Sequence, residues 1–212
     1  MTEQVCLLGR KRTKKIKGDN ENFMKKVLAV NGSPRHDGNT AHMLGIVLDV
    51  CKSAGFETEI YQAGGRTVKG CVACGVCKKT PGRCANDDWV NEVYEKMVEA
   101  DAIILGSPTY FSDLTPETKA VIDRCGSVSR GDGHSLSRKV GAAVSAVRRA
   151  GGIHTLDSMQ HFFLINDMFV VGSSYWNMSL CMGAGTFEND DEGVNTMKRL
   201  GENIVWLVNK IR

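Results

Sequence analysis

Four cysteines lie on one short stretch of this chain: Cys71, Cys74, Cys77 and Cys84. The first three form a C-x2-C-x2-C run, which brings three thiolates to one point, as a cubane iron–sulfur cluster requires. A structural zinc site more often joins two separated cysteine pairs. The spacing therefore favours a [4Fe–4S] cluster over zinc, and a reduced, metal-free cysteine loop is the alternative.

Segment 31–40 combines polar side chains with a permanent cation, and it leads into a helical pattern. Ser33, Asn39 and Thr40 offer hydrogen-bonding groups, Arg35 offers positive charge, and a helix N-terminus favours an anion. The segment is neither a Walker A loop nor a G-x-G-x-x-G turn. We therefore predict a phosphate-binding loop of a different type.

Two further loops follow short apolar runs and suit a flat ring. One carries two aromatic side chains beside small residues, where a planar ring could stack. The other carries paired glycines whose N–H groups could bond ring oxygens, although a plain turn into the next helix explains them equally well. With the phosphate loop, they describe a mononucleotide with an aromatic head, which FMN fits. The candidates are Pro108, Thr109, Tyr110, Phe111, Gly151 and Gly152.

Short apolar β-branched runs alternate with amphipathic helical segments along the chain. The pattern predicts an α/β fold: a doubly wound, flavodoxin-like sheet of five parallel strands in the order 2-1-3-4-5, with helices on both faces. A cysteine-rich loop over residues 70–88 follows the second strand. The expected strands are Lys26–Asn31, Glu57–Tyr61, Ala102–Gly106, Val140–Val147 and Phe169–Gly172.

Length, charge and cysteine content narrow the class of protein. The 212 residues suit one domain over 25–212, preceded by a basic extension over 1–24. That extension holds six basic and three acidic side chains, so it alone carries +3, the formal net charge of the whole chain. The neutral remainder argues against a nucleic-acid surface. No stretch is long enough to span a bilayer, and the cysteine content indicates reduced thiols or ligands in a cytoplasmic protein.

The three loops and the cysteine run resemble the NADPH-dependent FMN reductase-like group of flavodoxin-fold proteins, and within it the iron–sulfur flavoproteins. The resemblance runs from residue 25 to about residue 190 and is most specific at Gly32–Arg35, Gly38–Thr40, Gly70–Asp88 and Ser107–Tyr110. It implies that the first loop binds the FMN phosphate and that the Ser-Pro-x-Tyr loop flanks the isoalloxazine. It also implies a [4Fe–4S] cluster near the flavin of a neighbouring subunit, in a homodimer or homotetramer.

The leading hypothesis is an oxidoreductase that passes electrons between FMN and the cluster, or between NAD(P)H and an acceptor. Cations at Lys78, Lys79 and Arg83 should attract an acidic electron-transfer protein. No Ser-His-Asp or Cys-His constellation is present, and the five histidines lack metal-ligand spacing, so no catalytic acid–base residue is assigned. The alternatives are a cluster-free NAD(P)H-dependent FMN or quinone reductase, and a non-enzymatic flavin carrier or redox sensor.

Overall fold

The computed structural model describes residues 24–183 and 185–212, so Cys6 and the extension before Met24 lie outside the described residues. The strands are β1 (Lys26–Asn31), β2 (Glu57–Gln62), β3 (Ala102–Pro108), β4 (Val140–Val147), β5 (Phe169–Val170) and β6 (Met178–Leu180). The helices are α1 (Asn39–Ser53), α2 (Trp89–Glu99), α3 (Pro116–Gly131), α4 (Gly152–Ile165) and α5 (Asp191–Ile211), with 3-10 turns η1 (Val76–Lys78) and η2 (Phe187–Asn189).

The sheet confirms the predicted flavodoxin-like topology. Its strands run in the order β2-β1-β3-β4-β5, and every neighbouring pair is parallel. The edge next to β4 is divided, because β5 pairs with its first residues and β6 pairs with its last three. The expected fifth strand therefore stops at Val170. Beyond it, the N–H of Val171 still donates to the carbonyl of Gly141 in β4 (2.9 Å), and the carbonyl of Gly172 accepts instead from Asn203 Nδ2 of α5 (2.9 Å).

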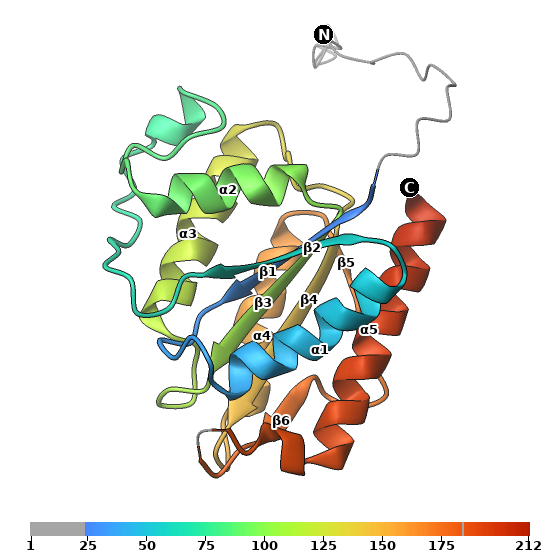
Figure 1. Cartoon of the computed structure of the whole chain (residues 1–212). Helices are drawn as coiled ribbons and strands as arrows, with labels where there is room; N and C mark the ends of the chain where they lie inside the picture. The colour runs from blue at the N-terminus through green and yellow to red at the C-terminus, as the bar shows by residue number, and fades with distance from the viewer. Residues whose placement is uncertain (1–23, 184) are drawn as a thin grey trace, which may run out of the picture.

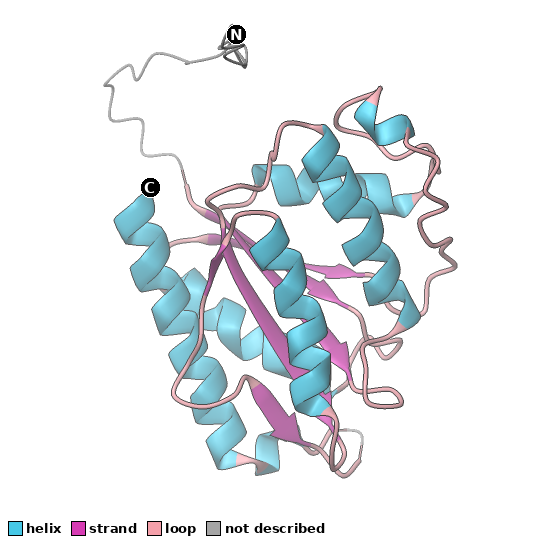
Figure 2. Ribbon diagram, turned by 180° about the vertical axis from the view of Figure 1, so that it is seen from behind, coloured by secondary structure: helices cyan, strands magenta, loops and turns pink. Residues whose placement is uncertain are grey.

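Alternating side chains of the central strands separate the core into two layers. Val27 and Ala29 of β1 pack with α1 and α5, which cover one face of the sheet (Figure 1). Leu28 and Val30 pack with α2, α3 and α4 on the opposite face, which Figure 2 shows from behind. Both faces of β1 are thus apolar, as expected for a parallel sheet that is covered on each side. No helix in the described ranges is long and apolar enough to cross a lipid bilayer.

The helix N-termini fall into two kinds. Side chains cap three of them: Asp88 accepts from the N–H of Val90 at α2, and Thr115 and Asp190 cap α3 and α5 in the same way. By contrast, the N-cap residues of α1 and α4 are glycines, Gly38 and Gly151, so these helices have no side-chain cap, and neither has an acidic residue in its first turn. Both of these helices start where β1 and β4 end, at the carboxyl edge of the sheet. Ligands of such sheets bind at this edge.

Candidate functional site

The first loop, residues 31–40, is held against the start of α3. The N–H of Gly32 donates to the carbonyl of Gly106 (2.7 Å), and Thr115 Oγ1 donates to the carbonyl of Gly32 (2.8 Å). A Cβ on Gly32 would lie 1.9 Å from Thr118 Oγ1. Only glycine therefore permits this approach, which places the loop beside the carboxyl end of β3.

The exit from β2 braces the same loop from the other side. Gln62 Nε2 donates to the carbonyl oxygen of Ser33 (2.7 Å). A Cβ on Gly64 would lie 2.3 Å from that oxygen. Ser33 is buried as a result, and its hydroxyl accepts from the N–H of Arg35 (3.2 Å). The position of the loop is thus set by neighbouring backbone on two sides.

The first loop presents hydrogen-bond donors suited to an anion. Within residues 24–183 and 185–212, the N–H groups of residues 39–41 make no backbone hydrogen bond and α1 has no side-chain cap, so these donors are available beside the Thr40 hydroxyl. Arg35 is exposed, and it forms no ion pair with the described residues. Donors at a helix N-terminus beside a free cation suit a phosphate. Two of the four residues predicted here, Arg35 and Thr40, supply such groups, whereas Ser33 is buried and its hydroxyl accepts from the N–H of Arg35.

The fourth, Asn39, has a different environment. Its Nδ2 donates to the carbonyl of Gly183 (2.6 Å), and its Oδ1 accepts from the N–H groups of Thr186 (3.0 Å) and Phe187 (3.2 Å). The side chain thus ties α1 to the segment before η2. The Asn39 side chain therefore supports the first loop by holding this segment against α1, and only the backbone N–H of Asn39 is available to a phosphate.

His42 reinforces that contact, although the sequence analysis assigned it no role. Its Nε2 lies against Asp37 of the first loop, and its Nδ1 lies against Glu188 of η2. The hydrogen bond with Asp37 raises the pKa of His42, and Glu188 adds to the rise against the opposing effect of burial. A protonated His42 therefore joins the first loop to η2 through two carboxylates.

The second loop, which joins β3 to α3 and carries Tyr110 and Phe111, projects an aromatic side chain into solvent. Phe111 is fully exposed and Tyr110 is 45% exposed. Phe111 and Ser112 both have positive φ, 48° and 66°, in a turn closed by reciprocal backbone hydrogen bonds between Tyr110 and Asp113. Such backbone strain in non-glycine residues costs about 1–3 kcal/mol each and concentrates at ligand sites.

The base of the second loop is anchored below the surface. Pro108 and Thr109 are half-buried, and Thr109 Oγ1 lies 3.0 Å from both Ser145 Oγ and Thr155 Oγ1. These contacts join the ends of β3 and β4 to α4. Thr109 therefore positions the loop, while the two aromatic residues beyond it remain accessible.

The third loop packs directly on the second. Gly151 has a φ of 89°, and a Cβ there would lie 2.7 Å from Ser112 Cα. Gly152 is buried, and a Cβ there would lie 2.8 Å from Met178 Sδ. The backbone N–H groups at the start of α4 lie at this junction, and no side chain caps them. The structure thus brings the second and third predicted loops together.

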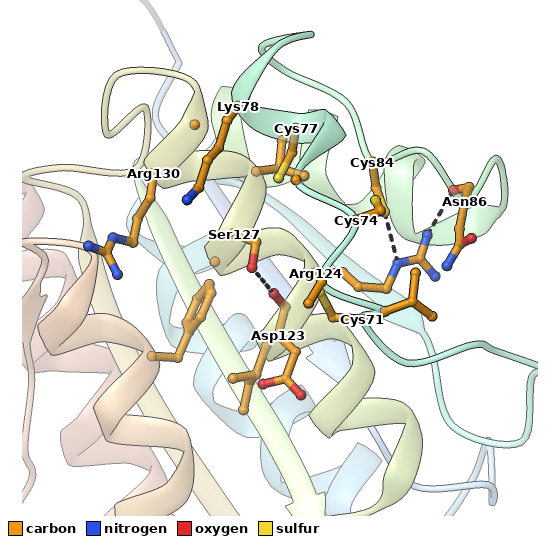
Figure 3. Close-up of a pocket in the computed structure, with 18 of the residues that line it drawn as sticks. Cys71, Cys74, Cys77, Lys78, Cys84, Asn86, Asp123, Arg124, Ser127 and Arg130 are labelled. Atoms are coloured by element: carbon orange, nitrogen blue, oxygen red, sulfur yellow. Dashed lines mark hydrogen bonds between the residues drawn. The ribbon is translucent and has the colours of Figure 1, made fainter.

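The predicted cysteine loop, residues 70–88, covers the outer side of α3 (Figure 3). Cys71 and Cys74 are exposed, whereas Cys77 and Cys84 are half-buried. All four line one cavity of about 960 Å³, whose other walls come from α3 and α4. No three of them come together as metal ligands in the described ranges. The thiols therefore share a cavity but are not drawn into a coordination site.

The other described thiols lie apart from this loop. Cys51, Cys125 and Cys181 are buried. Burial raises the pKa of Cys51 to about 12 and also raises the pKa of Cys125 and of Cys181. These three thiols stay protonated at neutral pH, so they are poor metal ligands.

Arg124 ties the cysteine loop to α3, and the sequence analysis did not single it out. Its guanidinium pairs with Asp88, the cap of α2, at 2.7 Å. Burial would raise the pKa of Asp88, but hydrogen bonds from Arg124 and from the N–H of Val90 outweigh burial and lower it. The signal in the sequence was a charged residue on the apolar face of a helix, between Val121 and Val128.

Comparison with known proteins identifies the family. The sequence profile of the NADPH-dependent FMN reductases matches residues 25–182. The chain belongs to this family. An iron–sulfur flavoprotein of Methanocaldococcus jannaschii is 36% identical over 88% of this chain and 99% of its own length. A second one, from Methanosarcina thermophila, is 36% identical over 70% of this chain and 78% of its own length.

Solved structures agree on the fold of this FMN reductase family member. The flavodoxin WrbA-like protein of Agrobacterium tumefaciens superposes with a TM-score of 0.61 at 15% identity, over 89% of this chain and 99% of that one. The predicted fold and family are therefore confirmed, and so is the prediction of an oxidoreductase. The individual ligand-binding residues stay predictions.

Proposed function

We propose that this protein is an FMN-dependent redox protein of the iron–sulfur flavoprotein type, which passes electrons between FMN and a [4Fe–4S] cluster and uses NAD(P)H or another donor. The observation that carries the flavin site is the pair of uncapped helix N-termini, α1 and α4, at the carboxyl edge of one sheet. The donors at α1 suit a phosphate, and the loops beside α4 suit a flat ring.

Each part of the flavin would meet a different group of the chain. The N–H groups of residues 39–41, the Thr40 hydroxyl and the Arg35 guanidinium would hold the phosphate. Tyr110 and Phe111 would cover the ring and keep water from it. N–H groups at Gly151 and Gly152 would donate to the ring oxygens. When bound, FMN supplies hydride acceptance and one-electron transfer, and the chain contributes placement and electrostatics.

The cluster would be held by Cys71, Cys74, Cys77 and Cys84. Two observations support this: the four thiols line one cavity, and similar proteins carry the name iron–sulfur flavoprotein. Four thiolates are the usual ligands of a [4Fe–4S] cluster. Because no three thiols lie in a coordination geometry in the described residues, the loop would have to close around the metal.

The two proposed sites are connected by α3. Its cap, Thr115, holds the first loop through Gly32, and Arg124 holds the cysteine loop. Arg124 lies about 14 Å further along the helix axis, at 1.5 Å per residue. Within one chain, this distance separates the cysteine loop from the proposed flavin site. It is compatible with the arrangement that the family resemblance implies, in which the cluster passes electrons to the flavin of a neighbouring subunit.

Arg35 tests the phosphate assignment. Arg35→Ala removes a charge-assisted contact and should weaken FMN binding about tenfold, or about 1.4 kcal/mol, without changing iron content. Lys52→Ala is the matched control, because Lys52 is an exposed cation at the other end of α1. FMN content and the dissociation constant are measured on purified protein. Equal FMN affinity in Arg35→Ala and wild type would contradict the assignment.

Cys74 tests the cluster assignment. Cys74→Ser should abolish iron binding and leave FMN bound, because the cysteine loop contributes no residue to the flavin loops described above. Cys181→Ser is the matched control, since this thiol is buried beside the Ser179 hydroxyl and outside the cavity. Iron, sulfide and FMN are quantified on anaerobically purified protein. Iron at the wild-type level in Cys74→Ser would show the cluster assignment to be wrong.

A cluster-free NAD(P)H-dependent FMN or quinone reductase is the second candidate. The observation that favours it is the separation of the four thiols, which leaves the cysteine loop as a cover over α3 and α4. This candidate predicts steady turnover of a nicotinamide with a dye acceptor after all four cysteines become serine. The iron–sulfur proposal predicts that the same variant loses one-electron transfer to a protein acceptor.

We also propose that the protein associates with itself through the β5–β6 edge. Neither strand pairs with a further strand on its outer side in the described sheet, and the apolar side chains along this edge are about half exposed. Phe169 is 45% exposed, Leu180 is 56% exposed, and Tyr175 and Trp176 between the two strands are each 55% exposed. An open edge with such side chains favours pairing with another copy.

The proposed electron-transfer partner is an acidic protein, and the proposed location is the cytoplasm. Lys78 and Lys79 are exposed within the cysteine loop, and neither forms an ion pair with the described residues. Arg83, the third predicted cation, is paired with Asp87 at 2.5 Å. The free charge for steering a partner therefore comes mainly from the two lysines.

A further inference from the structure

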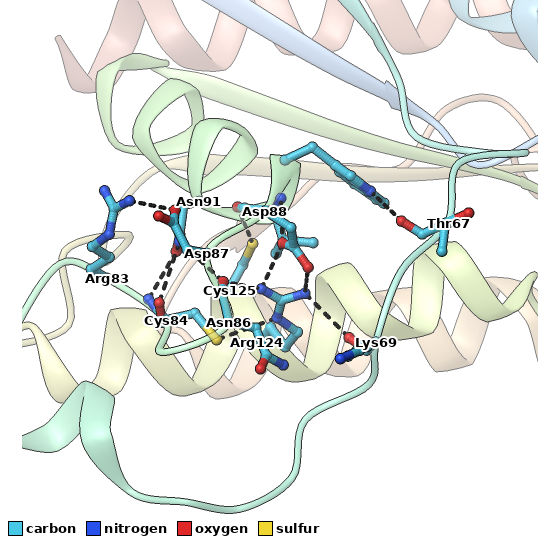
Figure 4. Close-up of polar contacts among 12 residues, drawn as sticks. Thr67, Lys69, Arg83, Cys84, Asn86, Asp87, Asp88, Asn91, Arg124 and Cys125 are labelled. Atoms are coloured by element: carbon cyan, nitrogen blue, oxygen red, sulfur yellow. Dashed lines mark hydrogen bonds and ion pairs between the residues drawn. The ribbon is translucent and has the colours of Figure 1, made fainter.

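Arg124 is a buried cation beneath the cysteine loop. Its side chain has no exposed surface, and it is the largest fully buried side chain in the described chain. It extends from the middle of α3 toward residues on both sides of the four cysteines (Figure 4). A buried guanidinium is costly unless each of its N–H groups has a partner.

All five N–H groups of the guanidinium have one. Nη1 donates to Asp88 Oδ2 (2.8 Å) and to the carbonyl of Lys69 (3.2 Å). Nη2 donates to Asp88 Oδ1 (2.7 Å) and to the carbonyl of Asn86 (2.8 Å). The fifth donor, Nε–H, points at Cys84 Sγ at 3.3 Å. Four donors therefore fix the guanidinium, and the fifth is directed at a predicted cluster ligand.

The sulfur that receives this hydrogen bond is itself held in place. Asn91 Oδ1 accepts from the N–H of Cys84 (2.8 Å), and Asn91 Nδ2 lies 3.3 Å from the carbonyl of the same residue. Asn91 is buried on α2, in the turn that follows the helix cap Asp88. The backbone of Cys84 is thus fixed by α2 while its sulfur faces α3.

A thiol is a weak hydrogen-bond acceptor, whereas a metal-bound thiolate is negatively charged and accepts strongly. A guanidinium N–H aimed at Cys84 therefore suits the thiolate form of this residue. Adding one electron to a cluster adds one negative charge beside the guanidinium. A hydrogen bond to a ligand sulfur favours that reduced form and raises the reduction potential.

We propose that Arg124 is a positioning residue that orients the Cys84 sulfur and raises the potential of the cluster through its Nε–H. This inference rests on the proposed function, because it requires the cluster. The Asp88 carboxylate acts on the potential in the opposite direction, since it offsets part of the positive charge of the Arg124 guanidinium. A purely structural role for Arg124 would hold the loop without changing the potential.

The test measures the cluster midpoint potential by anaerobic redox titration, followed by electron paramagnetic resonance. Arg124→Lys keeps the charge but loses the planar fork that serves Asp88 and Cys84 together. It should lower the equilibrium constant for one-electron reduction about tenfold, which is about 59 mV. Arg130→Lys is the matched control, since Arg130 is an exposed cation of α3 that lines the same cavity; its potential should equal that of wild type.

Asp88→Asn provides a test of opposite sign. Asparagine is an equally good helix cap, so α2 should be retained while one negative charge and one of the two side-chain acceptors of the guanidinium are lost. The potential should rise. This variant also decides the matter if Arg124→Lys fails to retain iron.

The outcomes separate the inference from the proposed function. Wild-type protein with FMN but no iron would overturn the cluster assignment, and the Arg124 inference with it. A loaded cluster whose potential is unchanged in both Arg124→Lys and Asp88→Asn would overturn the inference alone. A fall in one variant and a rise in the other would support it.

Discussion

Adding one methyl group at Gly64 should disturb the proposed phosphate site without removing any group that contacts the ligand. Gly64 follows β2, and its φ lies outside the left-handed region, so alanine is conformationally allowed there. Its Cβ would lie 2.3 Å from both the carbonyl carbon and oxygen of Ser33, and 2.5 Å from the carbonyl oxygen of Gly32. These neighbours are backbone atoms, so no flexible side chain can yield.

The size of the effect follows from these distances. Comfortable contacts lie near 3.5 Å, so the two backbones must separate by about 1 Å. Overpacking of this kind costs about 1–3 kcal/mol. The same shift would weaken the hydrogen bond from Gln62 to Ser33 and move the donors of the first loop. We expect Gly64→Ala to lower the free energy of unfolding by about 2 kcal/mol and to raise the FMN dissociation constant about tenfold.

Gly45→Ala is the matched control, because Gly45 lies within α1 and a Cβ there would have no neighbouring atom within 4 Å. Alanine there should stabilise the helix by up to about 1 kcal/mol and leave FMN binding unchanged. Both variants are compared with wild type by urea unfolding and by FMN titration of flavin-depleted protein. Wild-type FMN affinity in Gly64→Ala would refute the reasoning, as would an equal loss in Gly45→Ala.

Three further outcomes are expected. The pKa of His42 is raised, chiefly by its hydrogen bond with Asp37, so protonated His42 stabilises the fold fully below about pH 6.5, and this stabilisation is lost as the pH rises through the raised pKa. The difference in melting temperature between wild type and His42→Gln should therefore shrink as the pH rises through this range. A difference that stays constant with pH would contradict this. Phe111→Gly should relieve a positive φ and stabilise flavin-depleted protein by about 1 kcal/mol in urea unfolding while weakening FMN binding; unchanged FMN affinity would argue against a role at the ring. Leu180→Lys should reduce self-association in sedimentation experiments and the control Val98→Lys on α2 should not, so equal sedimentation of both variants would exclude the β5–β6 edge.

The sheet could be predicted because local patterns determine it. The apolar runs of β1 and β3 are buried on both faces, and the alternation with helices leaves few arrangements of parallel strands. A threonine followed by a proline is a common helix start, and α3 begins at Pro116 directly after its cap Thr115. The division of the edge beside β4 into β5 and β6 could not be predicted from local patterns. The contact between Asn203 and Gly172 that accompanies this division joins distant parts of the chain.

The loops were predicted by residue type, but their partners were not. Asn39 was predicted as a phosphate ligand because it offers hydrogen-bonding groups where the first loop enters a helix, and its partners at Gly183, Thr186 and Phe187 could not be seen in the local sequence. Arg124 left a signal, since a charged residue stood on the apolar face of α3. Its partners lie outside that helix, so the sequence alone could not show what it binds.

The absorption spectrum of anaerobically purified protein, before and after dithionite, tests the central claim most directly. We predict a flavin spectrum on a broad visible shoulder, with both bleached by the reductant, and iron and sulfide in a ratio that fits one [4Fe–4S] cluster. A flavin spectrum without the shoulder would contradict the iron–sulfur assignment and favour the cluster-free reductase. Protein without any visible absorption would contradict both cofactor assignments.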